Sequence, residues 1–130
     1  MPRRMRAGDA AADLPAQHDA VIGPGARALV GTGFAVALPP GMCGLVLSRS
    51  GLALNQGVAV LNAPGLIDSG YRGELQVVLH NTSDETVKIQ RGQRIAQLLI
   101  LPVPSVAFQA AHELPEPIDD RGDQGWGSSG

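Results

Sequence analysis

The fold is decided by residues 62–81, Asn-Ala-Pro-Gly-Leu-Ile-Asp-Ser-Gly-Tyr-Arg-Gly-Glu-Leu-Gln-Val-Val-Leu-His-Asn. Leucine and valine alternate with other side chains over 75–79, a pattern typical of a β-strand with one buried face. Because residues 66–68 lead into a tight turn at 69–70, we predict a β-hairpin over this stretch. A flat ligand between its two strands would meet backbone N–H and C=O groups at the spacing of a sheet. The carboxylate of Asp68 would lie at the far end of such a ligand.

Glycine and proline divide the rest of the chain into short apolar stretches that are rich in leucine and β-branched residues. No long segment has helical periodicity, so we predict an all-β fold of the sandwich or jelly-roll type. Strands are predicted near residues 20–23, 26–31, 33–38, 43–48, 57–61, 66–68, 71–80, 86–90 and 94–103. A last strand is expected around 106–108. We divide the chain into a β-sandwich domain over 1–108 and, over 109–130, a strap with a glycine-rich arm that is mobile without ligand.

Composition limits the classes of function. The chain has 130 residues, a formal net charge of -2 and 17% charged residues, so we expect one domain without the basic surface of a nucleic-acid-binding protein. Cys43 is the single cysteine, which indicates a reducing compartment. The basic residues 2–6 precede Ala-Gly-Asp rather than an apolar run, so no signal peptide is predicted. The longest apolar run is too short for a membrane span, and we expect a cytoplasmic protein with no membrane partner.

Five segments resemble the signature motifs of the trimeric dUTP diphosphatases (dUTPases), in the order in which that family carries them. Residues 65–75, Gly-Leu-Ile-Asp-Ser-Gly-Tyr-Arg-Gly-Glu-Leu, resemble the third motif. The others are Gly-Asp-Ala-Ala-Ala-Asp-Leu at 8–14, Ser-Arg-Ser-Gly-Leu-Ala at 48–53, Gly-Gln-Arg-Ile-Ala-Gln-Leu at 92–98 and Arg-Gly-Asp-Gln-Gly-Trp-Gly-Ser-Ser-Gly at 121–130. The resemblance covers most of the chain. It implies Mg²⁺-dependent hydrolysis of dUTP to dUMP and pyrophosphate, by attack of water at the α-phosphorus.

The same resemblance implies a jelly-roll-like (β-clip) homotrimer with three active sites at its subunit interfaces. The first, second and fourth motifs would come from one subunit, the hairpin from another and the C-terminal arm from the third. The family usually carries a strand before the first motif, whereas this sequence opens almost directly on that motif. A small core with few large side chains would gain from burying strand faces against partner subunits.

Asp68 and its neighbours each have two interpretations. An aspartate before Ser-Gly commonly bonds the amides of its own turn, whereas the resemblance implies that Asp68 orients and activates the attacking water. The sequence pattern alone indicates that Tyr71 is an ordinary aromatic residue of a strand. The resemblance implies instead that its ring lies under the deoxyribose and excludes a 2′-hydroxyl. Asn62 is a turn residue or a contact to uracil. The resemblance implies that backbone groups near Gln76 pair with the base, and cytosine would leave them unpaired.

The segment 48–57 is predicted to be a strand end and a short helix, with Ser50 as its N-cap and a glycine at its end. Free N–H groups at the start of a helix suit phosphate. The resemblance implies that Arg49, Ser50 and Gly51 bind the phosphate chain and stabilise the departing pyrophosphate. The family usually has proline where this sequence has Ser48, a departure that bears on the rigidity of the loop.

Asp13 is a solvated turn residue on pattern alone, and the resemblance implies that it helps to hold Mg²⁺ through water. Mg²⁺ keeps several waters and prefers substrate phosphates, so a dense carboxylate cluster is not required. Gln97 lies among apolar residues, where an unpaired amide is costly, so it either bonds backbone or, as the resemblance implies, reaches the phosphates. Arg94 is expected to be a structural surface or interface residue. The three histidines and the cysteine show no spacing typical of a metal site.

The arm residues that the resemblance assigns to the substrate are Arg121, Trp126, Gly127, Ser128 and Ser129. A terminal tail rich in glycine and serine is most often a disordered end. A guanidinium and hydroxyls nevertheless suit the γ-phosphate, and an aromatic ring suits the base. Trp126 and Gln124 both depart from the residues that the family usually has at these positions.

Two other functions remain open on the sequence alone. A dCTP deaminase has a similar fold, but the deaminases have a glutamate where this sequence has Val78, so the proton carrier for deamination is missing. A non-catalytic trimer that binds nucleotide or a regulatory partner is the second alternative. The presence of Asp68, Tyr71 and the whole fifth motif argues against it.

Overall fold

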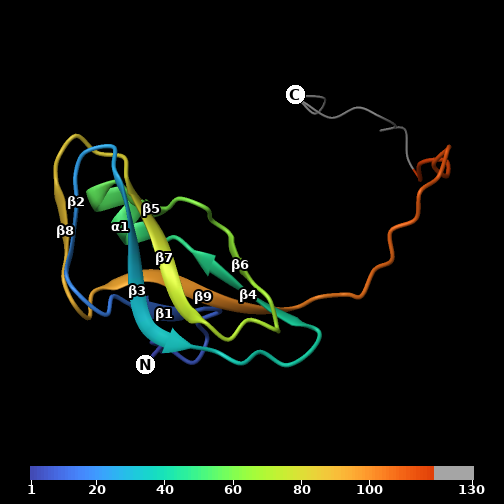
Figure 1. Cartoon of the computed structure of the whole chain (residues 1–130), viewed down its shortest axis with the longest axis horizontal. Coiled ribbons are helices and arrows are strands. Elements are labelled where there is room, and N and C mark those ends of the chain that lie inside the picture. The colour runs from blue at the N-terminus through green and yellow to red at the C-terminus, as the bar shows by residue number, and fades with distance from the viewer. Residues whose placement is uncertain (119–130) are drawn as a thin grey trace.

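The computed structural model describes residues 1–118, and Figure 1 shows how their elements are arranged. These residues form short strands and a single helix, so the predicted all-β fold is confirmed. The elements are β1 (Ala12–Pro15), β2 (Ala20–Ile22), β3 (Arg27–Ala35), β4 (Met42–Leu47), α1 (Ser50–Gln56), β5 (Val58–Val60), β6 (Gly65–Ile67), β7 (Glu74–Asn81), β8 (Val87–Ile89) and β9 (Arg94–Pro102).

The strands pair antiparallel in three sheets. One sheet has the order β1-β9-β4-β6, a second has the order β3-β7-β5, and β2 pairs with β8. Buried side chains from all three sheets and from α1 meet in one hydrophobic core, with the β2-β8 pair at one end of the molecule (Figure 1). Strand alternation explains this core, since Leu75, Val77 and Leu79 on β7 point inward while the residues between them do not.

The hairpin predicted over 62–81 is wrong in its strand pairing. β6 pairs with β4, whereas β7 lies between β3 and β5 in another sheet. After β5 the chain turns away, since the Ala63 N–H donates to the Val60 carbonyl at 3.2 Å. Gly44 then lies opposite Ile67, and a Cβ on Gly44 would come within 3.3 Å of the Ile67 Cβ. The close approach of β6 to β4 therefore depends on a residue without a side chain.

The tight turn predicted at 69–70 is confirmed. The Tyr71 N–H donates to the Asp68 carbonyl at 3.0 Å, which closes the turn. The guanidinium of Arg72 stabilises the turn, because Arg72 Nη1 donates to the Ser69 carbonyl at 2.7 Å. The following strand begins at Glu74, three residues later than predicted.

Other differences from the predicted strands have local causes. The segments 26–31 and 33–38 were predicted separately and form one strand, β3, whose pairing with β7 is interrupted by a bulge at Gly33, with φ of 73°. β1 was not predicted, because a buried acid and a proline fall within four residues. Its proline is tolerated because β1 is an edge strand.

The chain contains no further strand between β9 and residue 118, so the strand predicted around 106–108 is wrong. Prolines at 102 and 104 remove backbone donors there, and Figure 1 shows this segment running away from the sheets. The side chain of Phe108 is 95% exposed as a result. Within residues 1–118, no helix has the length and apolar character needed to cross a membrane.

Candidate active site

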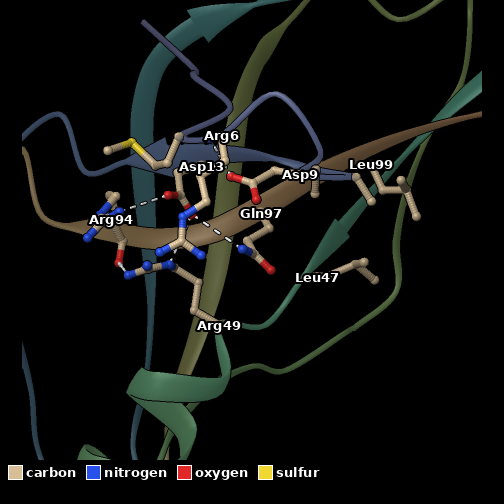
Figure 2. Close-up of a pocket in the computed structure, with 11 residues that line it drawn as sticks. Arg6, Asp9, Asp13, Leu47, Arg49, Arg94, Gln97 and Leu99 are labelled. Atoms are coloured by element: carbon tan, nitrogen blue, oxygen red, sulfur yellow. Dashed lines mark hydrogen bonds and ion pairs between the residues drawn. The ribbon is translucent and has the colours of Figure 1, made fainter.

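Three neighbouring strands bring the first, second and fourth motifs together. Asp13 on β1 lies opposite Gln97 on β9, which in turn lies opposite Leu47 on β4, and Arg49 follows β4 by two residues. These side chains surround a cavity of about 650 Å³ (Figure 2). The cavity is lined by Met5, Arg6, Asp9, Ala10, Ala11, Asp13, Leu47, Arg49, Arg94, Gln97 and Leu99.

Asp13 is the centre of the hydrogen bonds in this cavity. Its side chain is buried, and Oδ1 accepts from Arg49 Nε at 3.1 Å and from Gln97 Nε2 at 3.4 Å. Its Oδ2 accepts from Arg94 Nη1 at 3.1 Å. The interpretation of Asp13 as a solvated turn residue is therefore wrong, and the Gln97 amide is satisfied by a side chain rather than by backbone. One carboxylate links three motifs that are distant in the sequence.

Arg94 reaches Asp13 because of a bulge in β9. The register between β1 and β9 shifts at this point, so that β9 carries one extra residue. Under strict alternation, Arg94 and Gln97 would point to opposite faces of β9. Instead, Ile95 and Ala96 are both buried in the core, and the Arg94 side chain lies in the cavity. The sequence pattern missed Arg94 for this reason, since only the paired strand reveals the bulge.

The charges that line the cavity favour an anionic ligand. Three guanidiniums, from Arg6, Arg49 and Arg94, face two carboxylates, from Asp9 and Asp13, which leaves one net positive charge. Arg6 was not predicted, and its nearness to the first motif is the one signal that could have indicated it. Its backbone is fixed by Asp9, which accepts the Arg6 N–H at 2.8 Å and donates its own N–H to the Arg6 carbonyl at 3.1 Å. A cationic cavity of this size suits a polyphosphate.

The second motif forms the start of α1. The helix begins at Ser50 with Arg49 at the N-cap and no side-chain cap, so the predicted cap is wrong by one residue. Ser50 and Gly51 are exposed at this end and do not line the cavity around Asp13. The Ser48 hydroxyl accepts the Val60 N–H at 2.8 Å, and this bond ties the loop to β5. The loop is thus fixed by a hydrogen bond at the position where the family usually has proline.

The third motif forms a second group of residues in the loop before β7. The Asp68 side chain is exposed and accepts no hydrogen bond from residues 1–118, so nothing supports its interpretation as a turn cap. The Tyr71 hydroxyl donates to the Glu74 carbonyl at 2.8 Å. Its ring lies over Gly73, where a Cβ would come within 2.5 Å of the hydroxyl oxygen. Asn62 is exposed in the preceding loop, between β5 and β6.

The backbone of β7 has an open edge at Gln76. Bonded and non-bonded pairs alternate along antiparallel strands, so the even-numbered residues of β7 direct their backbone groups to the β5 side. There the Val78 carbonyl accepts the Leu61 N–H at 2.9 Å, and the Glu74 carbonyl accepts the Tyr71 hydroxyl. Between them, the Gln76 N–H and C=O have no hydrogen-bond partner on this side among the described residues, because β5 has ended. A donor and an acceptor at sheet spacing are therefore available beside the Tyr71 ring.

One chain does not bring all the predicted site residues together. Asn62, Asp68, Tyr71 and Gln76 do not line the cavity that contains Asp13. The predicted arm residues outside the described part of the chain are Arg121, Trp126, Gly127, Ser128 and Ser129. The described residues thus contain two separate groups, a cationic cavity and an open strand edge.

The Asp13 carboxylate is better suited to hold a metal ion through a water molecule than to bind it directly. No three or more His, Cys, Asp or Glu side chains within residues 1–118 are grouped so that they could hold a metal ion. An ionised carboxylate offers about four acceptor positions, and Asp13 uses three of them for Arg49, Gln97 and Arg94. One acceptor position is left for a metal-bound water. Because the cavity is net positive, a cation would also need the negative charge of a phosphate ligand.

A small all-β fold with a cationic cavity and an open strand edge defines a candidate nucleotide-binding protein. A sequence profile of the dUTPase family matches residues 1–130. The chain is 53% identical over 131 residues to the deoxyuridine 5'-triphosphate nucleotidohydrolase of Corynebacterium glutamicum, an alignment that covers 100% of this chain and 87% of that protein. It is 50% identical over 131 residues to the protein of the same name from Thermobifida fusca, covering 100% and 72%. The chain belongs to the dUTPase family.

Solved structures agree with this family and confirm the fold. The Staphylococcus bacteriophage 80alpha dUTPase with dUPNHPP superposes with a TM-score of 0.91 at 30% identity, covering 100% of this chain and 91% of that chain. A mutant of the phage phi11 dUTPase, whose structure describes the coordination of a structural Mg(II) ion, has a TM-score of 0.80 at 27% identity and covers 87% and 90%.

Proposed function

We propose that this member of the dUTPase family hydrolyses dUTP to dUMP and pyrophosphate. The observation that carries the proposal is the open backbone edge at Gln76. Uracil presents an acceptor, a donor and an acceptor along one edge, and the Gln76 N–H and C=O can satisfy the first two. The amide of Asn62 supplies a donor for the remaining acceptor. Cytosine changes this pattern and would leave buried groups unpaired, which typically gives discrimination of ~10⁴ or more.

Tyr71 gives the proposed site its selectivity for deoxyribose. Its hydroxyl is fixed to the Glu74 carbonyl and its ring packs on Gly73, so the ring cannot retreat toward the backbone. A sugar stacked on this ring would have no room for a 2′-hydroxyl. The same contact explains why the residue at position 73 has no side chain.

Asp68 is the proposed catalytic residue. Its carboxylate is exposed and has no hydrogen bond to residues 1–118, so it is free to hold a water. In that role it orients the water and takes its proton as the oxygen attacks the α-phosphorus, in line with the departing pyrophosphate.

The proposed phosphate contacts come from the second and fourth motifs. Arg49, Ser50 and Gly51 stabilise the charge that develops on the departing pyrophosphate, and Gln97 lines the cavity together with Arg49. Mg²⁺ bound with the nucleotide would neutralise part of the phosphate charge, and Asp13 would hold it through water.

A homotrimer with its sites between subunits is also part of the proposal. The separation of the cationic cavity from the open strand edge within one chain supports it. Phe108 and Ile118 are exposed apolar side chains on the segment after β9, and a partner subunit would cover them. Residues 121–130 would close the site of another subunit. The free thiol of Cys43 supports a reducing, cytoplasmic location.

Product analysis tests this function. The purified protein is incubated separately with dUTP, dCTP, dTTP and UTP, first with Mg²⁺ and then with a chelator. We expect dUMP and pyrophosphate from dUTP alone, and loss of turnover with the chelator. Deamination of dCTP would identify a deaminase instead, and binding of dUTP without turnover would identify a non-catalytic nucleotide-binding protein.

A further inference from the structure

We propose that Arg94 is a positioning residue that acts through Asp13 to aim the Arg49 guanidinium at the phosphates. The inference rests on the proposed function, because it assigns a role within the phosphate part of that site. The family resemblance gives Arg94 no such role, and strand alternation would place it on the other face of β9.

Two contacts from Arg94 hold Arg49. The Arg94 side chain donates to Asp13 Oδ2, while Asp13 Oδ1 accepts Arg49 Nε, each at 3.1 Å. The Arg94 carbonyl accepts Arg49 Nη1 at 3.1 Å (Figure 2). These bonds use two of the five N–H donors of the Arg49 guanidinium. The other three are left for a ligand in the cavity that Arg49 lines.

The Arg94 side chain fixes the orientation of the carboxylate. A carboxylate bonded through one oxygen alone can rotate, and its rotation would swing the acceptor on which Arg49 Nε depends. The side chain of Arg94 is 47% exposed, whereas those of Arg49 and Asp13 are 24% and 10% exposed. Because solvent screens the outer ion pair, its main contribution is geometric rather than electrostatic.

The bulge in β9 is an independent observation that points the same way. A regular strand would direct residue 94 into the core side of the sheet, where a guanidinium is costly. The extra residue instead buries Ile95 and directs Arg94 to Asp13. Bulges commonly re-aim a side chain beside an active site.

A double-mutant cycle separates positioning from direct contact. We expect Arg94→Met to lower kcat/KM for dUTP by roughly 10-fold, and to lower it no further in a chain that already carries Asp13→Asn. Arg94→Lys should restore part of the loss, because lysine still donates to Asp13. The matched control is Arg91→Met, which removes an exposed guanidinium from the nearby turn and should leave kcat/KM unchanged.

Two results of the cycle would overturn the proposal. An equal loss in both backgrounds would mean that Arg94 contacts the nucleotide directly. No loss in either background would mean that Arg94 is an ordinary surface residue.

A measurement without nucleotide keeps the test separate from the proposed function. Hydrogen exchange of the Arg49 Nε–H is followed by NMR, with the signal assigned from its absence in Arg49→Lys. Arg94→Met should speed this exchange by about 10-fold or more, because the bond to Asp13 is loosened, and Arg91→Met should not. Unchanged exchange in Arg94→Met would refute the inference. Faster exchange in a protein that does not hydrolyse dUTP would refute the proposed function and leave the positioning role intact.

Discussion

Replacing Gly73 with alanine should weaken the discrimination between deoxyribose and ribose while it leaves the fold almost as stable. A Cβ at this position would lie 2.5 Å from the Tyr71 hydroxyl oxygen and 2.7 Å from Cζ, so one of the two groups must move. The Tyr71 side chain is the group that can move, because it is 41% exposed and can swing outward. That movement breaks its 2.8 Å hydrogen bond to the Glu74 carbonyl.

The expected change in stability is small because two effects oppose each other. The lost hydrogen bond contributes about 0.5–1.5 kcal/mol. Alanine in place of glycine stabilises by about 0.4–1 kcal/mol, because it reduces the freedom of the unfolded chain. The free energy of unfolding should therefore change by less than about 1 kcal/mol. The steric rejection of a hydroxyl is worth more, and the ratio of kcat/KM for dUTP to that for UTP should fall by about 10- to 100-fold.

The assay measures kcat/KM separately for dUTP and UTP, together with the thermal midpoint at fixed protein concentration. Gly70→Ala is the matched control, because it lies in the same loop and a Cβ there meets no atom within 4 Å. Unchanged sugar discrimination in Gly73→Ala would refute the position of the Tyr71 ring under the sugar. A large loss of stability would show that the backbone gives way rather than the ring.

Three further changes test other parts of the site. Asp68→Asn should lower turnover by ~10²–10⁴ while dUTP still binds, as kcat and equilibrium binding will show, and unchanged turnover would remove Asp68 from the mechanism. Ser48→Ala leaves the Val60 N–H without its acceptor and should lower the free energy of unfolding by about 1–2 kcal/mol, seen as a lower denaturant midpoint with the same m-value. An unchanged midpoint would mean that water replaces the hydroxyl. Deleting residues 121–130 should remove most turnover without changing the elution volume of the proposed trimer, whereas a monomer would indicate that the arm has a structural role.

Local patterns were sufficient for the parts of the fold that depend on neighbours in the sequence. The alternation over 75–79 predicted the strand that becomes β7. The glycine expected to end the helix is Gly57, whose φ of 64° is the left-handed conformation that glycine adopts readily. β6 could not be assigned to its partner in this way, because its pairing with β4 depends on Gly44, which is distant in the sequence and lies opposite Ile67.

The cationic cavity could be predicted only in part. Asp13, Arg49 and Gln97 were singled out by resemblance to the family motifs, but their mutual contacts could not be, since Asp13 is 36 residues from Arg49 and 81 from Arg94. The bulge that directs Arg94 to Asp13 is a property of two paired strands. The residue pattern of either strand alone does not predict this bulge.

The open edge of β7 at Gln76 is short, and its length limits which molecules can pair with it. An unpaired strand edge usually recruits another strand, which is the first step of edge-to-edge aggregation and of peptide binding by strand addition. Here the bond from Leu61 to Val78 closes one side of the opening and the Tyr71 hydroxyl closes the other. A peptide needs several consecutive pairs to bind by strand addition, whereas a single base needs one. The opening is therefore long enough for a single nucleobase, and it gives a foreign polypeptide too little edge to extend the sheet.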